Sequence, residues 1–126
     1  MREGRRRDAF EGFAVMIEIT VMHYLEAQLP DVPWYMEKPE KPPERYGLVR
    51  KTGSGMVNHI HETTVAVQSI APSLYEAMLL NDRAVAALRA MSPADGVFTV
   101  RINSDYEYTD MTTKEHRYQA VAEVYH

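Results

Sequence analysis

Hydrophobic and polar residues alternate most clearly along the stretch from Phe98 to Tyr108. Apolar or aromatic side chains occupy Phe98, Val100, Ile102, Tyr106 and Tyr108, and polar ones occupy Thr99, Arg101, Asn103, Asp105 and Glu107. A period of two predicts a strand with one buried face and one solvent-facing face. Residues 109–115 are rich in polar turn formers, so residues 116–126 are expected to return as the second strand of one long β-hairpin.

The return strand, from His116 to His126, carries aromatic or apolar side chains on both of its sides. Such a strand is typical of a position that is covered on both faces. We therefore expect one face to lie on the core and the other to contact a neighbouring molecule. Removal of Arg117–His126 is expected to damage folding and assembly together.

A helical period begins at Met16. The apolar residues Ile17, Val21, Tyr24, Leu25 and Leu29 repeat at intervals of three and four, and Pro30 ends the pattern. Ile17, Ile19 and Val21 also alternate as in a strand, but the helical pattern persists longer and predicts a helix to Leu29. Residues 1–15 are interpreted as a basic extension, and a backward continuation of the helix through Ala9–Val15 stays open.

The second helix follows Pro72-Ser73. Ser73 and Glu76 have the spacing of a capping box, in which each side chain accepts a backbone N–H at the start of the helix. The predicted core stripe comprises Leu74, Ala77, Met78, Val85 and Leu88, and Ser92-Pro93 ends the helix.

Three strands are predicted between the helices. Proline residues restrict Trp34–Glu37 to a brief strand near a sheet edge. Tyr46–Thr52 is the next strand, Gly53-Ser54-Gly55 is predicted to be a mobile loop, and Asn58–Ile70 forms the third strand. The order predicts one α+β domain over residues 16–126, with one mainly antiparallel sheet and two helices packed on one face.

Composition narrows the class of protein. The chain has 126 residues, a formal net charge of −4 and a pI near 5.7, which argues against a general nucleic-acid binder. Four of the basic residues, Arg2, Arg5, Arg6 and Arg7, lie in the N-terminal extension, which could contact nucleic acid, an acidic partner or only solvent. Cysteine is absent, which excludes disulfides and cysteine-ligated zinc.

No apolar run approaches the roughly 20 residues that cross a bilayer. Asp8, Glu11 and Glu18 interrupt the segment after the arginines, so a signal peptide is not expected. The sequence therefore predicts a protein that does not enter a membrane and that is made and kept in a cytoplasm.

Two groups of polar residues are candidates for chemistry. His59 and His61 would share one face of a strand, where Glu62, His116 or His126 could complete a zinc or iron site. Spacing fixes no third ligand, and a solvent-facing pair is the alternative. The carboxylates Asp105, Glu107, Asp110, Glu115 and Glu123 could support acid–base catalysis or form a solvated face.

Two further features bear on binding. Gly53-Ser54-Gly55 lacks the spacing of a phosphate-binding loop. Eight tyrosines are many for this length, and tyrosine suits wet-edged cores and protein interfaces.

The order of short motifs across residues 16–126 resembles a known family. The motifs are Trp34-Tyr35-Met36-Glu37, Pro42-Pro43-Glu44, Lys51-Thr52-Gly53, Ala66-Val67-Gln68-Ser69, Pro72-Ser73-Leu74-Tyr75-Glu76-Ala77, Asn103-Ser104-Asp105-Tyr106, Thr109-Asp110, Thr113-Lys114 and Arg117-Tyr118-Gln119-Ala120-Val121. This pattern resembles the tail terminator or tail-completion group of minor tail proteins of long-tailed bacteriophages and prophages. The basic extension is outside the usual pattern of that group.

The resemblance implies a structural, non-enzymatic virion protein without a cofactor. Its subunits would form a homo-oligomeric ring, typically a hexamer, that ends tail-tube polymerisation at the head-proximal end and meets the head connector. DNA would pass through the lumen without sequence-specific binding, and the ring would be assembled in the bacterial host cytoplasm. The alternatives are a head-side neck or stopper protein and a small metal enzyme using His59, His61 and Glu62.

Under this hypothesis two sets of residues form contacts. Core or inter-subunit contacts are assigned to Tyr106, Tyr108, Arg117, Tyr118 and Gln119. Partner contacts are assigned to the Met56–Glu62 segment, which includes His59 and His61, and to Arg5, Arg6 and Arg7.

Overall fold

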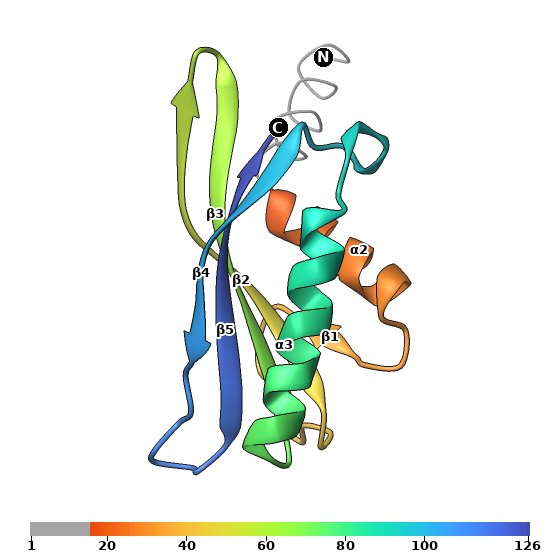
Figure 1. Ribbon diagram of the computed structural model, residues 1–126, viewed down its shortest axis with the longest axis vertical. Helices are drawn as coiled ribbons and strands as arrows, with labels where there is room; N and C mark the ends of the chain where they lie inside the picture. Colours follow the sequence, from red (N-terminus) through yellow and green to blue (C-terminus); the bar gives the residue numbers. More distant parts are fainter. Residues whose placement is uncertain (1–15) are drawn as a thin grey trace, which may run out of the picture.

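The computed structural model describes residues 16–126, which form a five-stranded sheet with two α-helices against it (Figure 1). In chain order the elements are α2 (Ile17–Gln28), β1 (Trp34–Tyr35), β2 (Tyr46–Val57), β3 (Ile60–Ala71), α3 (Leu74–Arg89), a 3-10 helix (Pro93–Asp95), β4 (Thr99–Glu107) and β5 (His116–Tyr125). The prediction of an α+β fold is confirmed. No helix within residues 16–126 is long and apolar enough to cross a membrane.

The strand order is β1-β2-β3-β5-β4, and all neighbours are antiparallel except the short parallel pair β1 and β2. The return strand β5 therefore lies inside the sheet between β3 and β4. Both helices lie on the same side of the sheet, as Figure 1 shows. Within residues 16–126 no helix covers the opposite side of the sheet, which is called the helix-free face below.

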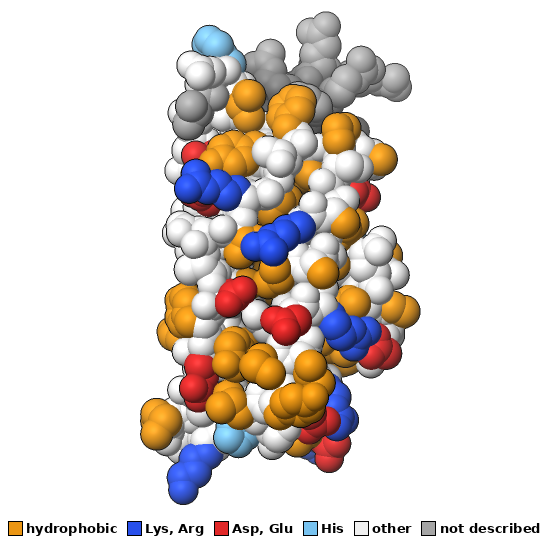
Figure 2. Space-filling model, in the orientation of Figure 1, with side chains coloured by type: hydrophobic (Ala, Val, Ile, Leu, Met, Phe, Trp, Pro, Cys, Tyr) orange, Lys and Arg blue, Asp and Glu red, His pale blue; other side chains and the backbone are white. Residues whose placement is uncertain are grey.

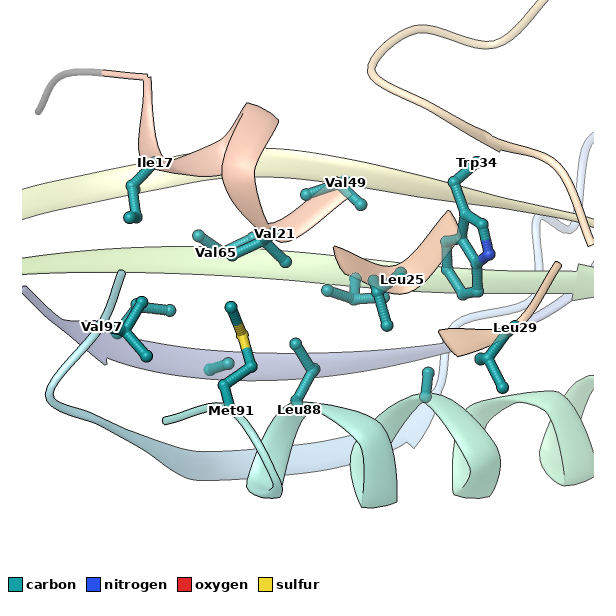
Figure 3. Packing of buried hydrophobic residues seen from close by; sticks show 14 of the residues in the cluster. Ile17, Val21, Leu25, Leu29, Trp34, Val49, Val65, Leu88, Met91 and Val97 are labelled. Carbon is teal, nitrogen blue, oxygen red and sulfur yellow. The ribbon is translucent and has the colours of Figure 1, made fainter. Parts of the chain in front are cut away.

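The main core lies between the helices and the sheet (Figure 3). Ile17, Val21 and Leu25 of α2 are at most 2% exposed, which confirms the helical interpretation of this segment. They meet Leu88 of α3 and Val65 of β3 in one cluster. The pattern of three- and four-residue steps places these side chains on one stripe of α2 that the sheet covers.

Ser73 caps α3 as predicted, since its Oγ accepts the backbone N–H of Glu76 at 3.1 Å. The Glu76 carboxylate accepts the Ser73 hydroxyl instead of the Ser73 backbone N–H, so only half of the capping box forms. The core stripe is shifted from the prediction, because Leu74 is 37% exposed while Leu80 and Ala84 are buried.

The prediction of a loop at Gly53-Ser54-Gly55 is wrong, because β2 continues through these residues to Val57. A β-bulge between Lys51 and Gly53 bends the strand and shifts its register against β3. The chain instead reverses at Asn58 and His59, whose φ values of 51° and 68° are those of a two-residue hairpin turn.

A second bulge, between Ile102 and Ser104, divides β4. Above it, Val100 and Ile102 pack against the main core. Below it, the extra residue reverses the alternation, so Tyr106 lies on the helix-free face beside Gln119. The prediction that Val100, Ile102, Tyr106 and Tyr108 share one buried face is therefore wrong.

Candidate functional site

Arg117 is the centre of a polar network on the helix-free face of the sheet. Side chains along β5 alternate between the two faces of the sheet. Ala120, Ala122 and Val124 are buried against the helices, so Arg117 lies on the opposite face. Arg117 Nη2 donates to Asp110 Oδ2 and Glu115 Oε1, both at 3.1 Å, and its side chain is only 15% exposed. Its Nη1 donates to Gln68 Oε1 at 3.3 Å, which joins the loop after β4 to β3.

Glu115 links this network to the start of β2. Tyr46 Oη donates to Glu115 Oε2 at 2.7 Å, and Lys38 Nζ lies 3.4 Å from the same carboxylate. Burial and then the hydrogen bond to the Glu115 carboxylate raise the pKa of the Tyr46 phenol far above its ordinary value of 10. Tyr46 also packs with Leu48 and Ile70 in a small second cluster. The Pro-rich segment and the loop before β5 are thus held together across one end of the sheet.

Asp110 organises the loop between β4 and β5. Its Oδ1 accepts the backbone N–H groups of Thr112 and Thr113 at 2.9 and 3.3 Å, and these bonds lower the pKa of the Asp110 carboxyl. All four carboxylate oxygens of Asp110 and Glu115 therefore accept hydrogen bonds. This arrangement is a structural clamp: neither carboxylate is poised as a free proton donor or acceptor.

A row of polar side chains continues from Arg117 toward the edge of the sheet. Gln68 Nε2 donates to Gln119 Oε1 at 2.8 Å, and Gln119 Nε2 donates to Tyr106 Oη at 2.7 Å. The Tyr106 and Tyr108 rings meet edge to face with their centroids 6.1 Å apart. A groove of about 520 Å³ lies beside this row, and Lys38 and Arg50 bring positive charge to it. Chains of hydrogen bonds of this kind fix side-chain orientation on an otherwise open face.

The structure sorts the residues assigned to the subunit interface. Tyr106, Tyr108, Arg117 and Gln119 come together on the helix-free face. Tyr118 does not join them, because it pairs with Ser69 on the opposite face of β5.

On the side seen in Figure 2, hydrophobic and charged side chains are interspersed over the surface.

The second assigned region is the tip of the β2–β3 hairpin. Met56 is 57% exposed there, and His59 occupies the turn. The imidazole of His61 stacks on His126, with ring centroids 5.5 Å apart. Thr63 Oγ1 lies 2.8 Å from His126 Nε2, and burial followed by the charges of His61 and Lys51 lowers the pKa of His126.

The premise of the metal hypothesis is wrong, because His59 lies in the turn and does not share a strand face with His61. Among residues 16–126, no three His, Asp or Glu side chains are grouped so that they could hold a metal ion. Arg5, Arg6 and Arg7 lie outside the described residues.

Tyr46 and Gln68 are site residues that sequence patterns did not identify, and Glu115 was identified only as one of a row of carboxylates. Tyr46 and Glu115 are 69 positions apart, and no local spacing signals their contact. A comparison of the chain with protein-family models and with curated proteins found no match.

Proposed function

We propose that this protein is a structural subunit of a long-tailed phage, and that it forms the ring that ends the tail tube and joins it to the head. The proposal starts from the ordered motifs over residues 16–126 that resemble tail terminator proteins. In this function the ring stays in the virion at the junction of tail and neck, after assembly in the bacterial cytoplasm. Its partners are further copies of the chain, the tube protein and the head connector.

The observation that carries the proposal is the constructed polar surface on the helix-free face. Four of the five residues assigned to core or inter-subunit contacts lie there. Arg117, Gln119 and Tyr106 belong to one hydrogen-bonded row, and the Tyr108 ring packs on Tyr106 at its end. Tyr106 and Tyr108 are 41% and 47% exposed, so they offer large amphipathic side chains to a neighbour. Exposed tyrosine side chains on an ordered surface are typical of protein interfaces.

The charge of the chain also supports the proposal. A ring that conducts DNA must not grip phosphate, and the net charge of −4 is compatible with a lumen of this kind. The clamp around Arg117 has the same consequence locally, because Asp110 and Glu115 neutralise that cation.

The test is reconstitution with the tail-tube protein encoded in the same genome. Tubes polymerised with the purified chain should be capped at one end and shorter than tubes polymerised alone, as seen by negative-stain electron microscopy. Tyr108→Asp should abolish capping, while Tyr75→Asp, on the exposed surface of α3, should preserve it. Uncapped tubes with the wild-type chain would contradict the proposal. Binding to the connector ring without binding to tubes would instead assign the chain to the head-side neck.

A further inference from the structure

Two strands have an edge without a neighbour among residues 16–126. β4 is the last strand of the sheet, and its residues are exposed or half-buried throughout. At the other end, β1 covers only Gly47 and Leu48 of β2, so the edge of β2 is open from Lys51 to Met56. Open edges present N–H and C=O groups that another strand can pair with.

The backbone bonds of β4 determine which of its groups point outward. Tyr108 N–H donates inward to Arg117 of β5 at 2.8 Å. Successive N–H groups of a strand point to opposite sides of the strand. The N–H of Asp105, which lies three residues before Tyr108, therefore points outward, away from β5. Above the bulge, His126 N–H donates to His61 on the β3 side, so the N–H of Tyr125 points to β4 and Tyr125 pairs with Thr99. The N–H groups of Val100 and Ile102 therefore point outward.

The same reasoning applies to β2. Gly47 N–H donates away from β3 to Pro33 O at 2.9 Å. Lys51 lies four residues further on and before the bulge, so its N–H also points outward, away from β3. Above the bulge, Gly55 faces Glu62 of β3. His61 N–H donates to His126 O on the β5 side, so the N–H of the next residue, Glu62, points to β2 and to Gly55. The N–H groups of Ser54 and Met56, on either side of Gly55, therefore point outward.

We propose that a second copy of this chain docks its β4 edge on the β2 edge of the first, in antiparallel pairing that continues the sheet from subunit to subunit. The register places Asp105 opposite Lys51, Ile102 opposite Ser54, and Val100 opposite Met56. β2 and β4 run in opposite directions within one sheet, so copies in one orientation meet antiparallel. This inference rests on the proposed ring and identifies the contact that closes it.

The two bulges carry the register. If only one of the two strands had an extra residue, the alternation of its N–H groups would change beyond the bulge. Outward N–H groups of one strand would then lie opposite inward N–H groups of the other. Each strand has such a bulge, β2 between Lys51 and Gly53 and β4 between Ile102 and Ser104, and the two bulges face each other in the proposed register. One register therefore matches outward groups both above and below the bulges.

The side chains agree with this register. Asp105 and Lys51 lie directly opposite on one face, and neither forms an ion pair within residues 16–126. Arg50 lies opposite the Tyr106 ring on the other face. Opposite charges and cation–π pairs at facing positions stabilise antiparallel strands. The contact joins two different edges, so it repeats around a ring.

Proline substitutions test each edge separately, because proline removes an N–H and is tolerated on the outer side of an edge strand. Asp105→Pro removes only an outward N–H of β4, and Ser54→Pro removes only an outward N–H of β2. Each variant should stay folded by circular dichroism and be monomeric by light scattering, while the wild type associates. A 1:1 mixture should give a heterodimer that grows no further, because one intact β4 edge meets one intact β2 edge. Asp105→Ala, which keeps the N–H, should still associate.

Pairing of β4 with β4 predicts that Ser54→Pro still dimerises, and that result would overturn the proposal. A wild-type chain that is monomeric at all concentrations, or proline variants that associate like the wild type, would also overturn it. Tube capping by such variants would show that the tail function stands and the edge contact fails. Loss of tube capping by a wild type that still pairs edge to edge would show the reverse.

Discussion

Arg117 is the residue whose removal should most disturb the helix-free face. Arg117→Met keeps the length of the side chain but leaves Asp110 and Glu115 without their shared cation in a partly buried site. We expect the free energy of unfolding to fall by about 2 kcal/mol, as for other partly buried charged hydrogen bonds. Urea denaturation followed by circular dichroism measures it.

Arg101→Met is the matched control. The Arg101 side chain is 74% exposed and lies 3.7 Å from Glu123, so the pair is screened by solvent. We expect a loss below about 0.5 kcal/mol. Equal losses for the two variants would mean that the clamp around Arg117 does not stabilise the fold.

His126 should make stability depend on pH. Its pKa in the folded chain is lowered from its ordinary value of 6.5, chiefly by burial. The unfolded chain therefore binds more protons as the pH falls below 6.5, and stability is lost until the pH reaches the lower folded pKa. The thermal midpoint should fall between pH 7.5 and pH 5.5, and His126→Gln should reduce that fall. An unchanged pH dependence in this variant would contradict the assignment.

Local patterns predicted single residues well only where the cause was local. The Ser73 cap follows from a contact three positions along the chain, and the structure contains it. The spacing of Glu115 predicts only that it belongs to a row of carboxylates. It gives no sign of Tyr46 or Lys38, which reach Glu115 from distant segments. Long-range polar contacts require the fold, and the fold is decided by the hydrophobic periods.

At the scale of the element, α3 offers two adjacent leucines with opposite surroundings. Leu80 is 5% exposed in the main core, whereas Leu79 is 42% exposed. Leu80→Ala should lower the free energy of unfolding by about 3 kcal/mol, through lost burial and a cavity. Leu79→Ala should cost less than about 1 kcal/mol. Equal costs in urea denaturation would contradict the placement of α3 on the sheet.

The strands show where sequence periods fail. The span of α2 was predictable because the three- and four-residue repeat and Pro30 act locally. The bulges at Thr52 and Asn103 have no comparable signal, since each is fixed by pairing with a distant strand. Gly53 and Gly55 predict a loop, but pairing with β3 holds them in a strand. Each bulge reverses the faces beyond it, so a correct strand assignment still put Tyr106 and Tyr108 on the wrong side.

At the scale of the molecule, the sheet order explains the composition of β5. One face of β5 supplies Ala120, Ala122 and Val124 to the core, and the other supplies Arg117 and Gln119 to the polar network. Both faces are therefore used within one subunit, which accounts for the mixed pattern without a partner. The open edges lie elsewhere, on β2 and β4, and the proposed strand pairing between copies rests on them.

Removal of β5 should consequently abolish the fold itself. A chain without Arg117–His126 loses the pairing of both β3 and β4, because β5 lies between them. We expect it to show no cooperative thermal unfolding by circular dichroism. Removal of His126 alone breaks the two backbone bonds to His61, at 2.8 and 2.9 Å, and the side-chain contacts of His126 with Thr63 and His61. It should leave a cooperative transition at a lower temperature. A cooperative transition in the longer truncation would mean that β3 and β4 can close on each other, and the interior position of β5 would then be wrong.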